Sequence, residues 1–198
     1  MRTKNPERAT RLLDVAARLF GTQRFHEVRM DDVASEAGVG KGTIYRYFED
    51  KDELYLALLD RAADQLCDRI RTSVATAETT RTKLEALAIA VLQFFDEQPH
   101  VFDLIQRADA QRGIDSPWRK TREEAIHLVI AIFAEGKDRG IFSVSDPTVA
   151  ALLLLGGLRA VIRFGPRPHT AEQARQLVHM VLFGATNAPQ VNPANASI

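Results

Sequence analysis

The side chains with the clearest chemical purpose stand between residues 41 and 51, where a short helix is predicted. At about 100° per residue, Ile44 and Phe48 share one side of that helix and are expected to be buried. The opposite side then presents Gly42, Thr43 and Arg46. A narrow outward face with a hydroxyl and a guanidinium suits a groove, where these groups can bond to the edges of nucleobases.

Phenol and ammonium groups flank this outward face. Tyr45 and Tyr47 are expected on its two sides, and Lys41 and Lys51 at the two ends of the helix. Such groups reach the phosphates beside a groove and position the helix there. The alternative, that these side chains only solubilise the helix, leaves two exposed tyrosines without a purpose. The sequence therefore predicts contact with double-stranded DNA.

A second short helix is predicted directly before the first. Met30, Val33, Ala34 and Ala37 recur at the spacing of one buried helical face. Gly38 follows at the position where a helix that ends in the left-handed conformation favours glycine. Two short helices joined by such a turn form a helix-turn-helix, whose second helix enters the major groove.

The sequence has no arrangement typical of catalysis or of a metal site. The stretch GVGKGT resembles a phosphate-binding loop, but Gly42 and Ser35 stand where that motif requires a hydroxyl residue and a glycine. The five histidines lack metal-ligand spacing, and no nucleophile accompanies a base and an orienting acid. Cys67 is expected to be a small buried hydrophobic residue. We therefore expect no enzyme, no metal and no cofactor.

The bulk composition is that of a globular protein. The chain has 198 residues, of which 45% are hydrophobic and 26% charged, enough for one or two domains. The formal net charge is zero, so charge alone does not indicate a nucleic-acid partner. Neither a membrane-spanning run nor a signal peptide is predicted, and a single cysteine agrees with a reducing compartment. A cytoplasmic protein without a membrane partner is expected.

Caps and apolar spacing predict the other helices. Asn5 and Pro6 open a helix that is expected to stop at Gly21, and Asp50 with Glu53 opens a long one that passes residue 71. Further helices are expected to begin near residues 79, 100, 117, 147 and 171. No strand alternation competes with these patterns. The predicted fold is all-α, with about nine helices.

The segments RLLDVAARLF, DDVASEAGVGKGTIYRYF and DKDEL resemble the amino-terminal domain of the tetracycline-repressor (TetR) family of transcriptional regulators. The resemblance covers about residues 7–60. Arg24 and Arg29 depart from the usual pattern. Arg29 stands where Thr or Ser usually caps the second helix. The sequence therefore does not show what caps that helix, and a phosphate contact by Arg29 is expected instead.

The resemblance implies a division into domains. A three-helix DNA-binding domain is expected over residues 7–52, and a helix at about 51–73 links it to a ligand-binding and dimerisation domain over residues 74–186. Residues 187–198 are polar and contain proline, so this tail is predicted to be disordered.

An effector cavity between the middle helices is also implied by the resemblance. The candidate lining residues are mostly apolar: Phe94, Phe95, Phe102, Ile105, Trp118, His127, Ile130 and Phe133. Ordinary core packing is the alternative for the aromatic residues, and a structural role the alternative for the histidine. Because no charged residue stands obviously within these apolar faces, the expected effector is small and apolar or aromatic.

The carboxy-terminal part carries more apolar surface than one small domain needs. In the TetR family the last two long helices pair with the same helices of a second subunit. The resemblance therefore implies a set of candidate interface residues: Leu152, Leu155, Gly156, Val178, Leu182 and Phe183. A two-fold dimer also places two reading helices about one DNA turn apart, ~34 to 36 Å. Internal packing alone is the alternative.

These observations indicate a ligand-responsive, sequence-specific regulator that binds operator DNA as a homodimer. Repression, relieved by a small-molecule effector, is expected from the resemblance. Two other classes are open: a helical binding protein that keeps the fold without binding DNA, and a constitutive DNA-binding regulator without an effector. The intact Thr43 to Tyr47 face argues against the first, and a cavity in the middle bundle would argue against the second.

Overall fold

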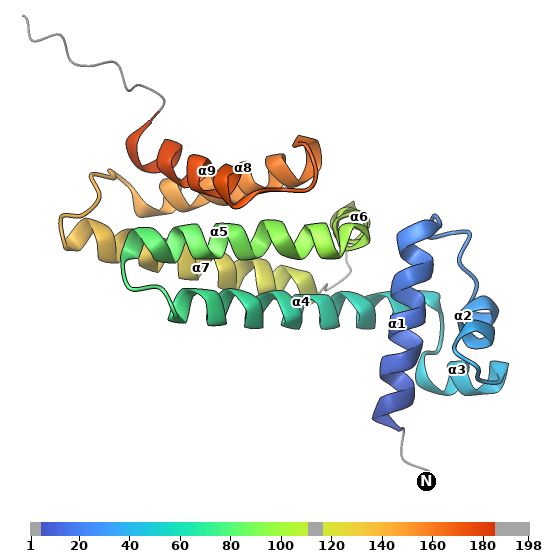
Figure 1. The fold of residues 1–198 in the computed structure, drawn as a ribbon. Helices are drawn as coiled ribbons and strands as arrows, with labels where there is room; N and C mark the ends of the chain where they lie inside the picture. The colour runs from blue at the N-terminus through green and yellow to red at the C-terminus, as the bar shows by residue number, and fades with distance from the viewer. Residues whose placement is uncertain (1–4, 111–116, 185–198) are drawn as a thin grey trace, which may run out of the picture.

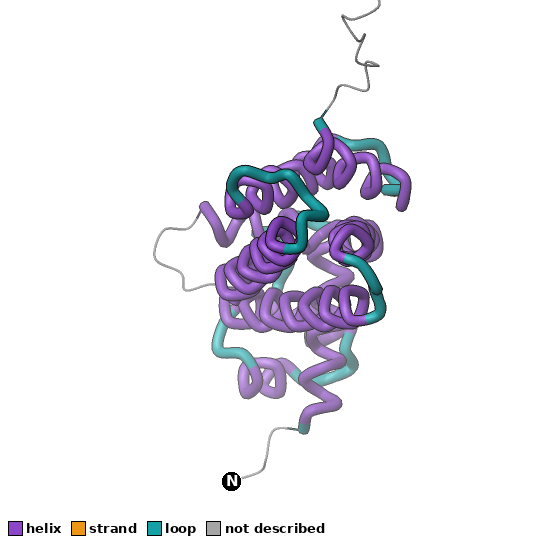
Figure 2. Tube along the Cα trace, turned by 90° about the vertical axis from the view of Figure 1, so that its left-hand side faces the viewer, coloured by secondary structure: helices purple, strands orange, loops and turns teal. Residues whose placement is uncertain are grey.

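The computed structural model describes residues 5–110 and 117–184. Nine α-helices form the regular structure within these ranges, and no strand occurs there, which confirms the all-α prediction (Figure 2). In chain order they are α1 (Pro6–Thr22), α2 (Met30–Glu36), α3 (Lys41–Tyr47), α4 (Lys51–Ala75), α5 (Thr80–Glu97), α6 (Pro99–Ala110), α7 (Pro117–Asp138), α8 (Pro147–Phe164) and α9 (Ala171–Phe183). The predicted disordered tail, 187–198, lies outside the described residues.

Side-chain caps define the start of most long helices. The capping residues are Asn5 for α1, Asp50 for α4, Thr79 for α5, Asp146 for α8 and Thr170 for α9. Each side-chain oxygen accepts a hydrogen bond from a backbone N–H in the first turn, which has no partner within the helix. Gly21 does not end α1 as predicted, because the helix continues through Thr22 and ends with the amide of Gln23 bound to the carbonyl of Leu19.

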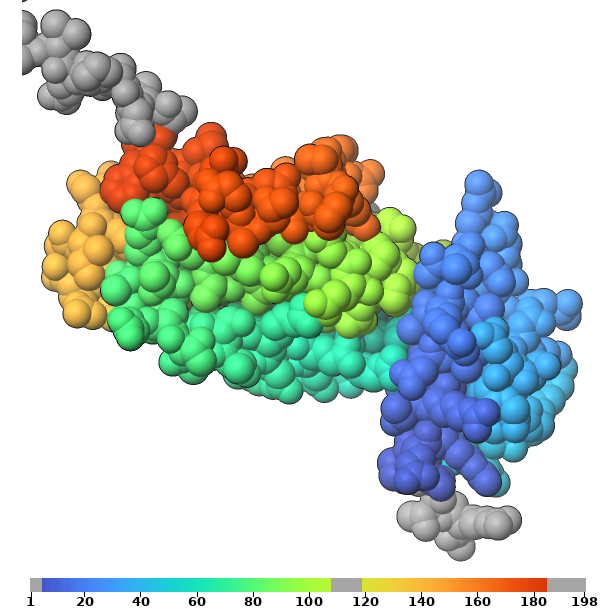
Figure 3. Space-filling model, in the orientation of Figure 1, coloured from blue at the N-terminus to red at the C-terminus, as the bar shows by residue number. Residues whose placement is uncertain are grey.

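Helix α4 joins a small three-helix unit to the rest of the molecule. Helices α1 to α3 pack together around one end of α4, α5 to α7 pack along its other part, and α8 and α9 lie over α5 and α7 on the side away from α4 (Figure 1). Buried Leu54 and Leu58 belong to the first part of α4, and Leu66 and Ile70 to the second. The hydrophobic core is therefore continuous from α1 to α9, although the α1–α3 unit projects from the end of the body (Figure 3).

Helix α8 is unusually apolar. Over its 18 residues the mean hydropathy is 1.6, so by length and composition alone it could cross a membrane, contrary to the expectation that no segment would. Only 28% of these residues are buried. Large apolar side chains face outward on α8, among them Val149, Leu152 and Leu153, of which Leu153 is 61% exposed. A single copy of the chain thus presents an apolar surface along α8.

The turn between α2 and α3 has the predicted backbone conformation. Gly38 has a φ of +66°, in the left-handed region, and the amide of Val39 donates to the carbonyl of Ala34 at 2.9 Å. Val39 then packs against the core. This conformation turns the chain directly from α2 into α3.

We predict that Gly38→Ala lowers the free energy of unfolding by about 1–2 kcal/mol, because a Cβ disfavours the left-handed conformation. Gly40→Ala is the matched control, since Gly40 has a φ of −70° and a Cβ there would meet no atom within 4 Å. Urea denaturation of both variants gives the comparison. Equal losses from the two substitutions would show that the turn does not depend on the conformation of Gly38.

Candidate nucleic-acid interface and internal cavity

Core packing fixes the rotation of α3 about its axis. Ile44 is fully buried and Phe48, at the end of the helix, is 7% exposed. Gly42 and Arg46 are exposed on the other side, and Thr43 is half-buried between the two. A Cβ added to Gly42 would meet no atom within 4 Å. The predicted outward face is therefore present at Gly42 and Arg46, whereas Thr43 lies at its edge instead of on it.

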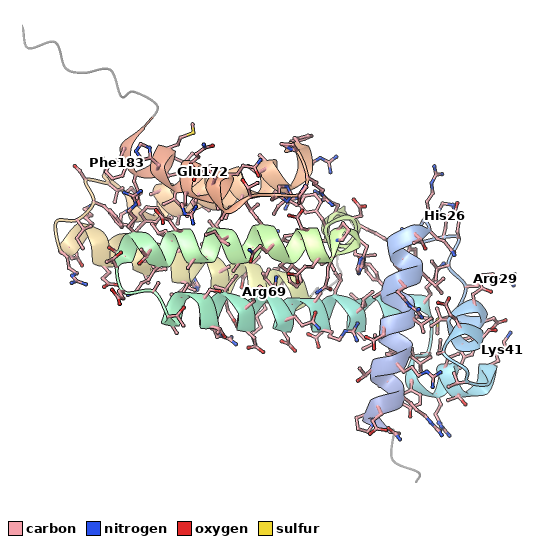
Figure 4. The ribbon with its side chains drawn as sticks, in the orientation of Figure 1. His26, Arg29, Lys41, Arg69, Glu172 and Phe183 are labelled. Carbon is pink, nitrogen blue, oxygen red and sulfur yellow. The ribbon has the colours of Figure 1, made fainter. Side chains whose placement is uncertain are left out.

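Two further cations lie at the amino-terminal ends of the short helices, at the outer edge of the α1–α3 unit (Figure 4). Lys41 begins α3, and its Nζ donates to Asp31 Oδ2 at 2.8 Å. This hydrogen bond raises the pKa of Lys41, so the ammonium stays charged at neutral pH. Arg29 is exposed and its side chain does not cap α2. Asp31 and Asp32 in the first turn of α2 instead complement the helix dipole.

The two tyrosines of α3 have different environments. Tyr45 is 44% exposed, as predicted. Tyr47 is only 5% exposed, so the prediction that it flanks an open face is wrong. Its hydroxyl accepts a hydrogen bond from the amide of Asn5 at 2.8 Å and donates to the carbonyl of Asn5 at 3.2 Å. Tyr47 lies three residues after buried Ile44 and therefore on nearly the same side, where it fastens the end of α3 to the start of α1.

Lys51 also points inward rather than outward. Its Nζ donates to the carbonyls of Phe25 at 2.8 Å and Val28 at 3.0 Å, and lies 4.6 Å from the centroid of the Phe25 ring. The ammonium thereby satisfies two carbonyls of the loop between α1 and α2. Lys51 was predicted to reach a phosphate at the end of the helix, but its ammonium bonds instead to these two carbonyls.

A cavity of about 300 Å³ lies between α4, α5, α6, α7 and α8. Most of its wall is aliphatic or aromatic, including Leu66 of α4 and Val91 of α5. Phe95, Phe102 and Ile105, which were predicted to line a pocket, do line it. Its volume is at the lower end of the range typical of small-molecule sites.

The other predicted pocket residues lie elsewhere. Phe94 and Phe133 are buried core residues, Ile130 packs against the core, and His127 is exposed; none of them lines the cavity. The side chain of Trp118 lies outside the described residues. Helix α7 faces the cavity about one turn earlier than predicted, through residues 121 to 126.

Charged side chains also line the cavity, contrary to the sequence-based expectation. Arg122 of α7 and Arg159 of α8 are both part of the lining and both exposed. The sequence contained a signal for Arg159, since it follows Leu155 by four residues and therefore lies on the same side of α8. Arg122 stands in the charged run TREE, which is indistinguishable from a solvated surface in the sequence.

The candidate interface residues fall into three groups. Leu152, Leu155 and Gly156 line the mouth of the cavity, and Leu152 and Gly156 are also exposed on the outer surface of α8. Phe183 is 54% exposed at the end of α9, on the outside of the bundle (Figure 4). The remaining two residues are Val178, which is buried, and Leu182, which is half-buried and packs against the core. The prediction that Val178 is available to a partner is wrong.

The close approach of α8 and α9 explains why Val178 is buried. A Cβ added to Gly157 would lie 2.7 Å from Leu177 Cδ1, so α9 sits tightly against a glycine of α8. The inner face of α9 is therefore used within the chain. Only the opposite face, with Met180 and Phe183, is open.

Helix α6 contacts both the cavity and the α1–α3 unit. Phe102 lines the cavity, and the carbonyl of Leu104 accepts a hydrogen bond from the hydroxyl of Tyr55 in α4. Further along, the guanidinium of Arg107 lies 3.7 Å from the centroid of the Phe25 ring. Phe25 belongs to the loop that precedes α2. One helix thus connects the cavity wall with the unit that carries α3.

The described residues contain no arrangement for metal binding, and the single cysteine is unreactive. No group of three or more His, Cys, Asp or Glu residues there is arranged to hold a metal ion. Cys67 is half-buried rather than fully buried as predicted, and burial raises the pKa of its thiol. The thiol is therefore protonated at neutral pH and weakly nucleophilic.

Comparison with known proteins supports the DNA-binding assignment of the amino-terminal unit. The family profile described as "Bacterial regulatory proteins, tetR family" matches residues 12–58. The transcriptional activator FasR of Mycolicibacterium smegmatis is 34% identical over 108 residues, which are 54% of this chain and 49% of FasR. The transcriptional repressor KstR2 of Rhodococcus jostii is 33% identical over 89 residues, 45% of this chain and 44% of KstR2. The chain thus matches about half the length of these curated relatives.

The fold similarity extends over nearly the whole chain. The structure of the regulator FadR from Bacillus subtilis in complex with stearoyl-CoA superimposes with a TM-score of 0.76 and covers 89% of this chain and 99% of that one. The sequence identity in this pair is 16%, so the similarity concerns the fold alone. The profile match shows that residues 12–58 resemble the amino-terminal domain of the tetR family of bacterial regulatory proteins, and the fold similarity extends beyond that segment.

Proposed function

We propose that this protein is a ligand-responsive transcriptional regulator that binds operator DNA as a homodimer in the cytoplasm and is released from it by an effector. The observation that carries the proposal is the outward face of α3, where Arg46 projects and half-buried Thr43 lies at the edge of a helix held by buried Ile44. Arginine is the commonest side chain in bidentate contacts to guanine, and a threonine hydroxyl can bond to several bases. The curated relatives are transcriptional regulators rather than enzymes.

The proposed division of labour follows the predicted domains. Residues 7–52 would read DNA, α4 would link them to the bundle, and residues 74–186 would bind the effector and the second copy. Outward Arg29, Lys41 and Tyr45 would contact phosphates around the reading helix. FasR is named an activator and KstR2 a repressor. We propose repression. A ligand that changes the spacing of the two reading helices would release the operator, and release would then permit transcription.

The proposed dimer uses the outer surface of α8 and the open face of α9. Val149, Leu153 and Gly156 project outward from α8, and Met180 and Phe183 from α9. An apolar surface of this kind is costly in water, and a two-fold pairing of the same helices would cover it. The pairing also supplies two reading helices for two half-sites.

The cavity supports an effector for this chain. A constitutive regulator would have a solid middle bundle, whereas about 300 Å³ lies open between α4 and α8. The FadR structure contains stearoyl-CoA, which makes an apolar chain a reasonable class of ligand to test here. Ligand binding changes DNA affinity only to the extent that it favours one conformation of the protein over another.

Helix α6 is the proposed connection between the two sites. A ligand that displaces Phe102 would move α6, and with it Arg107. Because Arg107 lies against Phe25, such a shift would change how the α1–α3 unit sits on α4. In a dimer this would alter the distance between the two copies of α3.

We predict that Arg46→Ala weakens binding to the operator about tenfold or more and relaxes the preference at one or two base pairs, because a base contact is lost. Arg29→Ala is the matched control, because Arg29 is an exposed cation that is not placed to contact bases. This substitution should weaken binding to all duplexes alike and reduce by about one the slope of the logarithm of the binding constant against the logarithm of the salt concentration. Fluorescence anisotropy on operator variants at several salt concentrations measures both. If Arg46→Ala lowered the affinity for every DNA sequence by the same factor, Arg46 would not contact bases.

Leu153→Glu and Gly156→Glu should each convert the dimer into monomers, because a carboxylate on the outer surface of α8 would be buried without a partner. Gln93→Glu, at an exposed position of α5, should leave the dimer intact. Light scattering during size-exclusion chromatography gives the mass. A dimer that persists in both α8 variants would move the interface to another surface.

The contact between α6 and the α1–α2 loop is testable by a double-mutant cycle. Arg107→Ala and Phe25→Leu should lower the free energy of unfolding by less together than the sum of their separate effects, with a coupling of about 0.5–2 kcal/mol. Arg69→Ala is the control, since Arg69 lies in the last third of α4, away from the α1–α3 unit, and pairs with Glu97 (Figure 4). Its effect should add to that of Phe25→Leu. Additive effects in both pairs would contradict a relay through Arg107.

A further inference from the structure

A second cavity, of about 320 Å³, lies where the α1–α3 unit meets the other helices. Phe20 and Gly21, at the end of α1, form one side of it. The start of α6, the last turn of α8 and Arg167 form the other sides. We call it the junction cavity. Phe102 and Ile162 line both this cavity and the apolar cavity between α4 and α8, so the two lie next to each other.

The charged groups that line the junction cavity are two guanidinium groups and one carboxylate. The guanidinium of Arg163 lies 5.4 Å from the centroid of the Phe164 ring. That of Arg167 donates a hydrogen bond to the carbonyl of Ile162 at 3.4 Å. Neither arginine is paired with a carboxylate within the described residues, and both are exposed. Asp103 is exposed too and has no hydrogen bond or ion pair there, so all three charged groups are available to a ligand.

His100 adds a polar group to the junction cavity without adding charge. Its pKa is lowered, first by burial and then by the positive charge of Arg61, so the imidazole is neutral at neutral pH. The end of α1 lies against this ring, because a Cβ added to Gly21 would be 3.5 Å from His100 Nδ1. The cavity therefore offers two cations, one anion and a neutral ring to a ligand.

We propose that the junction cavity binds a phosphorylated sugar, either free or as the sugar phosphate of a nucleotide. Arg163 and Arg167 would bind the phosphate through charge-assisted hydrogen bonds, for which the planar guanidinium is well suited. Asp103 would accept hydrogen bonds from sugar hydroxyls. A bare anion would leave Asp103 unsatisfied and would be repelled by it, and a neutral sugar would leave both arginines unsatisfied.

A ligand in the junction cavity would contact both parts of the molecule. Helix α1 belongs to the unit that carries α3, whereas α6 and α8 belong to the rest of the structure. The bound ligand would favour the orientation of the two parts that fits it best, and operator affinity would change by the strength of that preference. The junction cavity would then be a second regulatory site, separate from the proposed effector cavity.

Probes that contain the phosphate, the sugar or both test this assignment on the full chain. The phosphorylated sugars are ribose 5-phosphate, glucose 6-phosphate and AMP, and the partial probes are ribose and inorganic phosphate. Titration calorimetry at constant ionic strength gives the affinities. We expect at least one phosphorylated sugar to bind about tenfold or more tightly than either partial probe. Comparison of ribose 5-phosphate with AMP distinguishes a free sugar phosphate from a nucleotide.

Substitutions then identify the groups that bind the ligand. Arg163→Gln and Arg167→Gln should each reduce the affinity for the phosphorylated sugar about tenfold. Asp103→Ala should weaken the phosphorylated sugar and strengthen inorganic phosphate, because it removes both an acceptor and a repulsive charge. Arg175→Gln is the matched control, since Arg175 is exposed on α9, pairs with Glu172 and does not line the cavity. Circular dichroism confirms that the variants fold, and the comparison of probes on the unaltered chain does not depend on them.

Fluorescence anisotropy with the operator tests the regulatory role. The best-binding phosphorylated sugar should change operator affinity by about fivefold or more, and Arg163→Gln should abolish that change. An unchanged affinity at saturating ligand would overturn the regulatory role.

The other outcomes separate the junction cavity from the proposed function. Equal binding of inorganic phosphate and the phosphorylated sugars would overturn the sugar, and no binding of any probe would overturn the site. In both cases the operator binding of the unliganded chain, measured in the same way, would still support a DNA-binding regulator.

Discussion

The burial of one side of α3 is the constraint on which the rest of the structure depends. Ile44 is fully buried, and burying an isoleucine side chain contributes about 1.5–3 kcal/mol relative to leaving it exposed. A rotation of α3 by one residue, about 100°, would expose this side chain and bring polar ones into the core. The packing that stabilises the unit therefore also determines that Arg46 faces outward, and the same contacts serve stability and recognition.

The outward face could be predicted from the sequence, but two of its expected members could not. Helical spacing assigns a residue to a side of its own helix, and this placed Gly42 and Arg46 correctly. It contains no information about which distant segments fold back onto that helix. The amino-terminal end of α1 returns to Tyr47 through Asn5, and the loop before α2 returns to Lys51 through Phe25. Both side chains are occupied by contacts that only the tertiary structure creates.

The middle bundle was predicted well as a set of helices and less well as a site. Caps such as Asp50 and Thr170 are local, and their helices begin where expected. The cavity depends on how neighbouring helices are rotated and how closely they approach, as Gly157 and Leu177 illustrate. The rotation and spacing of these helices place Phe133 in the core and bring Arg122 and Arg159 into the lining of the cavity. The charge of the cavity was consequently the property that the sequence predicted least well.

Selection from a random pool of duplexes would measure whether α3 reads the major groove in a two-fold dimer. The purified chain would be incubated with the pool at moderate salt, and the bound duplexes sequenced after several rounds. A dimer that reads DNA through two copies of α3 should enrich a pseudo-palindrome whose two half-sites are centred about one DNA turn apart, roughly 10 base pairs, or a multiple of that. Recovery of unselected sequences, with binding that merely follows the salt concentration, would contradict it.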